Sequence, residues 1–304
     1  MNEKDRDQFV FSGITKAARH ASGDNPAHAK AVERFLRTGN IGLCKSTRYS
    51  LERIKKEGEH FSRCKAALWN LFDTLSGLLP ESAGNAPAVT PEMIQEKVKP
   101  MVLGLVQADW RDIALRELGT RIFVLNPEGT RRAIEAELST SWLGNAWNVF
   151  WLYFEDYKLK PKSIKLPSME GITSGTFAHV SHSAYERNDD RFDVVVHEAA
   201  HLLHYLKPKH YSLHVKRGQE RFVDVKFLDR ELFAYTCEAY TKVLEKGKSK
   251  AVKTFTEEIW KACACLPESK SFVKEIAGLL LKAAKSRNGW KVIKERTIEK
   301  RDRA

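Results

Sequence analysis

Two histidines and a glutamate form the pattern H-E-x-x-H within residues 194–206, and they are the strongest candidates for chemistry in this chain. His197 and His201 are four residues apart, so on a helix both imidazoles lie on one face and can bind one metal ion. Glu198, between them, can accept a proton from a water molecule beside such an ion. Zn²⁺ with three protein ligands and one open position hydrolyses amides in this way. The pattern therefore predicts a zinc site with Glu198 as the catalytic base.

The segment that carries this pattern is predicted to be a buried helix. Asp189 or Asp190 can provide the N-cap, and Pro208 is expected to end the helix. The apolar residues between these limits are Phe192, Val195, Val196, Ala199, Ala200, Leu202, Leu203 and Leu206. A helix that is apolar on nearly all sides is surrounded by protein, so its polar residues need a reason to be there. Metal ligation is one reason; the alternative is a pair of hydrogen-bonded core histidines beside a salt-bridged glutamate.

A third metal ligand must come from another element, and its identity defines the class of site. The pattern H-E-x-x-H-x-x-G-x-x-H requires glycine and histidine where this chain has His204 and Lys207, so that class is excluded. The open possibilities are a downstream glutamate on a second helix, a downstream histidine or an aspartate.

A second helix is predicted to begin at Asp229, a suitable N-cap. It carries Glu231 and Glu238, which are seven residues apart and share a face with the small Ala234. We expect Glu231 to be the third ligand. The alternatives are Glu238, His210 and His214.

The sequence Glu231-Leu-Phe-Ala, of the form E-x-F-A, begins 30 residues after His201. Together with H-E-x-x-H it resembles the glutamate-ligand zincins (gluzincins) and, distantly, the peptidase domains of the anthrax lethal factor type. The resemblance covers residues 192–240. It implies a zinc metallopeptidase with one Zn²⁺ ion, a zincin-like catalytic domain, and proteins or peptides as substrates.

Zincins place an edge strand beside the active-site helix, where the substrate pairs as an added strand. Residues 175–185 have the position and composition for this role, and Phe177, His179 and Ser181 alternate along one face. We expect these three residues to form the substrate strand. Hydrolysis also needs a donor to the developing oxyanion. The candidates for this donor are Tyr235, Tyr240, His210 and His214.

The chain of 304 residues predicts an α+β fold that is mostly helical. Residues 1–90 read as a helical N-terminal region, closed by the turn-rich segment 79–91. Residues 91–304 are expected to form the zincin-like domain, with a small sheet and the active-site helix, and to end in a basic helical tail. The aromatic cluster at 142–157 is interpreted as core packing in preference to a substrate-binding wall.

The formal net charge is +12, and residues 282–304 contribute +6 of it, with nine Lys/Arg against three Asp/Glu. Such a tail can attract an anionic partner, so alternative functions are a protease recruited to nucleic acid and a non-catalytic regulator or effector with a zincin fold. No apolar run is long enough to span a membrane. Five scattered cysteines and an N-terminus without an apolar core favour the cytoplasm, and secretion of an effector without a signal is also compatible. No pattern specifies an oligomeric state.

Overall fold

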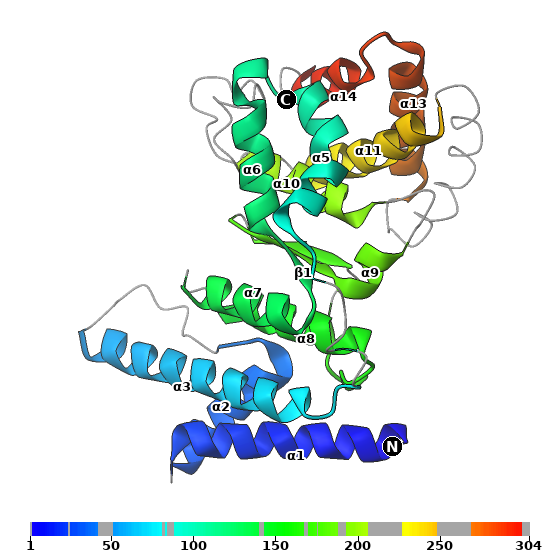
Figure 1. Ribbon diagram of the computed structural model, residues 1–304. Coiled ribbons are helices and arrows are strands. Elements are labelled where there is room, and N and C mark those ends of the chain that lie inside the picture. Colours follow the sequence, from blue (N-terminus) through cyan, green and yellow to red (C-terminus); the bar gives the residue numbers. More distant parts are fainter. Residues whose placement is uncertain are drawn as a thin grey trace. The chain divides into compact units, whose positions relative to one another are not determined.

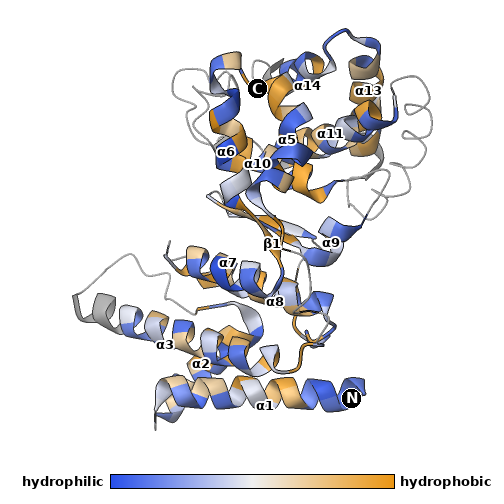
Figure 2. Ribbon diagram, in the orientation of Figure 1, coloured by the Kyte–Doolittle hydropathy of each residue, from blue (hydrophilic) through white to orange (hydrophobic). Residues whose placement is uncertain are grey.

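The computed structural model of the chain is dominated by helices, with one small sheet (Figure 1), which confirms the predicted α+β, mostly helical class. The residues that the structure describes are 2–23, 25–41, 51–80, 83, 88–139, 143–166, 170–174, 176–187, 193–205, 227–247 and 269–299. Most helices mix hydrophilic and hydrophobic residues along their length (Figure 2), as helices with one face in a core do. Within the described residues, no helix is long and apolar enough to cross a membrane.

The chain divides into two compact units. Unit 1 comprises Met1–Ala88 and Val124–Glu170, and unit 2 comprises Val89–Phe123 and Gly171–Ala304. The boundary after Ala88 falls inside the predicted linker. Residues 124–170, however, belong to unit 1, whereas the sequence placed them in the C-terminal domain. A turn-rich linker marks one crossing between units, but it does not reveal that the chain crosses back at 124 and again at 170.

In the described residues, the main helices of unit 1 are α1 (Glu3–Ser22), α2 (Pro26–Thr38), α3 (Leu51–Ser76), α7 (Pro127–Ser139) and α8 (Leu143–Asp156). The side chains of Asn2 and Asn25 accept hydrogen bonds from the first turns of α1 and α2, which fixes where these helices begin. Helix α1 packs against α2 and α3, and α8 packs against α3 and α7.

The aromatic residues of α8 form the core of unit 1, as the packing interpretation predicts. Phe150, Tyr153 and Phe154 are buried and form ring contacts with Phe72 of α3. The indoles of Trp147 and Trp151 donate to the carbonyl oxygen of Leu36 at 2.8 and 3.3 Å. These rings are occupied by core contacts and do not form a wall around a ligand.

Unit 2 carries the H-E-x-x-H helix. The helices described in this unit are α5 (Pro91–Leu105), η1 (Ala108–Trp110), α6 (Arg111–Arg121), α9 (His182–Glu186), α10 (Val194–Tyr205), α11 (Phe227–Lys246), α13 (Ser269–Lys285) and α14 (Gly289–Glu299). Helix α10 packs against α5 and α11 and also against the strands β2 (Gly171–Thr173) and β3 (Ala178–Ser181). Protein therefore surrounds α10 on several sides, as its apolar composition predicts.

The sheet has the strand order β1–β3–β2, where β1 is Ile122–Leu125. Strands β2 and β3 are antiparallel, with Gly171 opposite Val180 and Thr173 opposite Ala178. Because β3 is hydrogen-bonded to a strand on each side, it has no free edge for a substrate.

The predicted substrate strand is therefore wrong in length and in role. The strand ends at Ser181, whose side chain caps α9 by accepting from the backbone N–H of Ala184. The rings of Phe177 and His179 pack against Phe123, with centroids 5.7 and 5.6 Å away. Alternation along one strand identifies its two faces, but not whether its edges are paired.

Candidate metal centre

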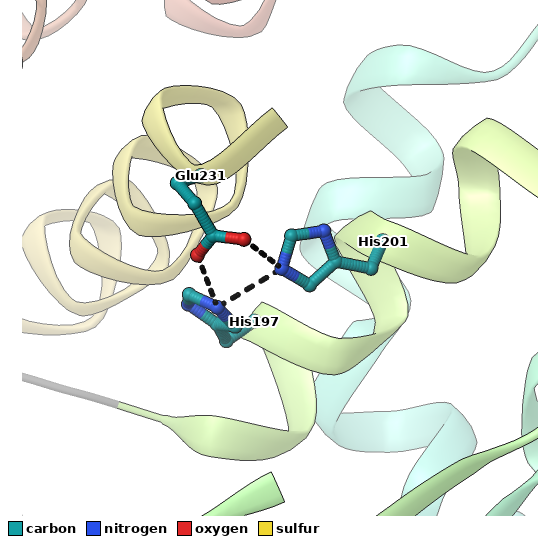
Figure 3. Close-up of side chains that lie close together, drawn as sticks. All are labelled: His197, His201 and Glu231. Atoms are coloured by element: carbon teal, nitrogen blue, oxygen red, sulfur yellow. Dashed lines mark hydrogen bonds and ion pairs between the residues drawn. The ribbon is translucent and has the colours of Figure 1, made fainter. Parts of the chain in front are cut away.

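Three predicted ligands converge where α10 meets α11 (Figure 3). The Nε2 atoms of His197 and His201 are 3.2 Å apart. One carboxylate oxygen of Glu231 lies 3.6 Å from Nε2 of His197, and the other lies 3.4 Å from Nε2 of His201. Ligands about 2.0–2.1 Å from a tetrahedral ion are separated by about 3.4 Å from one another. The three side chains thus have the donor types and the spacing to hold a metal ion.

The helices bring these ligands together through buried apolar contacts. On α10, Ala199 and Ala200 are fully buried, and on α11 the same holds for Ala234. Side chains this small allow two helix backbones to approach closely. Helix α10 begins next to Asp193, whose carboxylate accepts from the backbone N–H groups of Val195 and Val196 at 3.0 and 3.4 Å. Asp193 is thus the N-cap; Asp189 and Asp190 lie outside the described residues.

Asp193 also connects α10 to its neighbours through ion pairs. Lys97 of α5 lies 3.1 Å from the Asp193 carboxylate, and Lys242 of α11 lies 4.0 Å from it. The Lys242 side chain is about nine-tenths buried. These ion pairs hold the start of α10 from two sides. The sequence offers no signal for them, because their partners are distant in the chain.

Glu238 is not part of the ligand group but contacts the opposite side of His197. Its carboxylate lies 3.1 Å from Nδ1 of His197, and its side chain is 3% exposed. A carboxylate that accepts the Nδ1 proton orients the imidazole and leaves Nε2 available to a metal. The alternative assignment of Glu238 as third ligand is not supported by this geometry.

The charges at the centre are strongly coupled. Burial opposes the charged form of His197, but hydrogen bonds to Glu231 and Glu238 outweigh burial and raise the pKa of His197 to about 10. Burial also disfavours ionised Glu231, yet hydrogen bonds from the two histidines lower the pKa of that carboxyl to about 2. For Glu238 burial dominates and raises the pKa. Without a metal, the raised pKa keeps a proton on His197 near neutral pH, and a metal ion bound at Nε2 would take the place of that proton.

Glu198 lies on the side of α10 that faces strand β2. It is 6% exposed, and one carboxylate oxygen accepts a hydrogen bond from the hydroxyl of Thr173. A Cβ atom added to Gly171 would lie 2.6 Å from the other carboxylate oxygen. Neither Thr173 nor Gly171 was predicted from sequence, since a three-residue strand carries too little pattern to identify it.

Of the predicted oxyanion donors, the structure places one beside His197 and one in the core. The ring of Tyr235 meets the ring of His197 edge to face, with centroids 4.5 Å apart, so Tyr235 lies at the centre. Tyr240 is fully packed against Trp290, with centroids 4.8 Å apart, and is a core residue, which contradicts its candidacy. His210 and His214 lie outside the described residues.

Part of the basic tail is engaged by acidic residues of the same unit. Arg296 pairs with Glu275 of α13, and Lys291 lies 3.7 Å from Glu295. Residues 300–304 lie outside the described part of the chain.

Comparisons with protein-family models, with curated proteins and with solved structures find no match to this chain.

Proposed function

We propose that the protein is a zinc-dependent metallopeptidase. The observation that carries this proposal is the triangle of two imidazole nitrogens and one carboxylate, with sides of 3.2–3.6 Å, on an H-E-x-x-H helix. Two nitrogen donors and one oxygen suit Zn²⁺ better than Mg²⁺ or Ca²⁺, which prefer oxygen ligands. Three protein ligands leave a position open, as in catalytic rather than structural zinc sites.

In this proposal His197, His201 and Glu231 hold the ion, and Glu238 keeps the His197 ring in its orientation. Bound zinc supplies Lewis acidity, which lowers the pKa of water to about 7 and polarises a peptide carbonyl. Glu198 accepts the proton of the attacking water and delivers it to the leaving amine. Tyr235, beside His197, is the proposed donor to the developing oxyanion.

The proposed substrates are proteins or peptides, and the proposed compartment is the cytoplasm. Cys64 and Cys237 are free and buried, and burial raises the pKa of both thiols. Such thiols pack as small apolar groups, as expected of a chain in a reducing environment.

Metal analysis combined with a peptide-library cleavage assay tests the proposal. Purified wild-type protein should contain one zinc ion per chain, cleave members of the library, and lose cleavage when a chelator removes the metal. Glu198→Gln should keep the zinc and lose cleavage, because the amide cannot accept the proton. The matched control is Glu96→Gln, which changes an exposed glutamate on α5 and should behave as wild type.

Three results would contradict the proposal in different ways. Absence of bound metal at saturating zinc would refute the site. Full cleavage by zinc-loaded Glu198→Gln would refute the mechanism. Zinc binding by a wild type that cleaves no peptide would instead favour a non-catalytic regulator.

A further inference from the structure

The carboxylate of the proposed catalytic base lies against the outer strand of the sheet. In the order β1–β3–β2, strand β2 is at the end, and it packs against α10. Gly171 and Thr173 are two residues apart on β2, so they present the same face, whereas Ile172 presents the opposite face. The contacts of Gly171 and Thr173 with Glu198 identify that face as the one toward α10.

We propose that Thr173 and Gly171 form a seat that positions Glu198 for proton transfer. This inference rests on the proposed function and adds two positioning residues to it. Thr173 supplies a hydrogen-bond donor, and Gly171 supplies the space in which the carboxylate lies.

Thr173 acts through its hydroxyl. It donates to Oε2 of Glu198 and also lies 3.4 Å from the backbone carbonyl oxygen of the same residue. The hydroxyl is therefore held by the main chain of α10 as well as by the side chain that it orients. Thr173 occupies one lone pair of Oε2, which makes Oε1 the less engaged oxygen for accepting a proton. Fixing one oxygen restricts rotation of the carboxylate, so the carboxylate does not turn away from the reacting water.

Gly171 acts through the absence of a side chain. A Cβ atom there would lie 2.6, 2.7 and 2.8 Å from Oε1, Cγ and Cδ of Glu198. All three distances are shorter than a carbon atom tolerates, so Gly171→Ala must displace the Glu198 side chain. The two positions make different contributions, and each can be removed separately.

The experiment compares zinc-loaded Thr173→Val, Thr173→Ser and Gly171→Ala with wild type in steady-state peptide cleavage. Valine keeps the shape of threonine but removes the donor, so kcat should fall about 10²-fold while KM changes less than about threefold. Serine restores the donor and should return kcat to within about threefold of wild type. Gly171→Ala should lower kcat in the same way. Thr120→Val, the same change at an exposed helical site in unit 2, is the matched control and should leave kcat unchanged.

Two readouts do not depend on turnover. The zinc dissociation constant should be the same in all four variants, because neither seat residue belongs to the ligand group. Thr173→Val should lower the thermal midpoint by about 2–4 °C in the wild-type background and by less in Glu198→Ala, where the partner is already gone.

The possible outcomes distinguish failure of the seat from failure of the proposed peptidase function. Equal midpoint shifts in both backgrounds would show that Thr173 and Glu198 do not interact, and would overturn the seat. Unchanged kcat in Thr173→Val, or a serine variant as impaired as the valine variant, would overturn it while leaving the peptidase proposal intact. A zinc-loaded wild type without turnover would refute the proposed function and, with it, this positioning role.

Discussion

Replacing Glu231 and Glu238 separately by alanine should weaken zinc binding by unequal amounts. Glu231 places its two oxygens 3.6 and 3.4 Å from the two Nε2 atoms, so its loss removes one direct ligand. Structural sites with four ligands gain about 10–16 kcal/mol, or about 2.5–4 kcal/mol per ligand, which corresponds to roughly 10²–10³-fold in affinity. Glu238 reaches only Nδ1 of His197, at 3.1 Å, and losing a partner of this kind costs about 10–100-fold.

The proton on His197 makes both losses of zinc affinity depend on pH. With a pKa of about 10 in the metal-free protein, His197 must lose a proton to bind zinc, at a cost of about 4 kcal/mol at pH 7. Glu238→Ala lowers that pKa and so removes part of the cost, which offsets part of the lost orientation at pH 7. The deficit of Glu238→Ala should therefore grow as the pH rises toward 9. Glu231 also raises the pKa of His197, so the deficit of Glu231→Ala should grow in the same direction and remain the larger of the two at both pH values.

Competition titration against a chromophoric zinc chelator at pH 7 and pH 9 measures both effects. Circular dichroism shows whether each variant is folded, and Glu96→Ala, on an exposed side chain of α5, serves as the control. Glu231→Ala with an affinity within threefold of wild type would refute the assignment of the third ligand. A larger loss in Glu238→Ala than in Glu231→Ala at both pH values would show that the two glutamates have been assigned in the wrong order.

Three further perturbations test other parts of the site. Without metal, the raised pKa of His197 stabilises the folded protein fully below about pH 6.5, and this stabilisation is lost as the pH rises toward 10. The lowered pKa of Glu231 stabilises the folded protein fully above about pH 4.5, and this stabilisation is lost as the pH falls toward 2. Denaturant unfolding in a chelator should thus give a maximum between these limits, and a flat profile from pH 6 to 9 would contradict the charge assignment. Asp193→Ala should lower the free energy of unfolding by about 1–2 kcal/mol, and Asp193→Ser should lower it by less, since serine can still cap α10. Urea titration measures both losses, and equal losses would assign the effect to the ion pairs alone. Tyr235→Phe should keep zinc and lower kcat about 10²-fold, and an unchanged kcat would remove Tyr235 as oxyanion donor.

The parts of the site that depend on helix geometry could be predicted from the sequence. Residues four apart share a helical face, so the placement of His197 and His201 on one side of α10 required no knowledge of the rest of the fold. Small Ala234 predicted a close approach of the second helix to α10, and the E-x-F-A resemblance favoured Glu231 over Glu238 on that helix. The structure brings these three residues together as the sequence predicted, although the third ligand was one choice among four.

The parts that depend on sheet pairing could not be predicted in the same way. Strand β3 has an alternating pattern, but its position in the sheet is set by β1, more than 50 residues earlier in the chain. The residues predicted to bind substrate are therefore structural, and the strand that lies against Glu198 is the three-residue β2. A strand this short has no recognisable period, so Gly171 and Thr173 become visible only once the chain is folded.

The distribution of charge around α10 supports the proposal of a cation at this centre. Asp193 is compensated by Lys97 and Lys242. In the part of the chain that the structure describes, the other three carboxylates, those of Glu198, Glu231 and Glu238, have His197, His201 and Thr173 as their polar partners.

Each ionised carboxylate of this group is a largely buried negative charge, which is costly to desolvate, and at Glu238 burial raises the pKa. A proton on His197 adds one positive charge to the group, and a dication bound to neutral histidines would add two. The proton and the metal thus compete for the same atoms and relieve the same repulsion. Burial of three acidic groups around two histidines therefore supports the proposed divalent-ion centre over the alternative of two hydrogen-bonded core imidazoles.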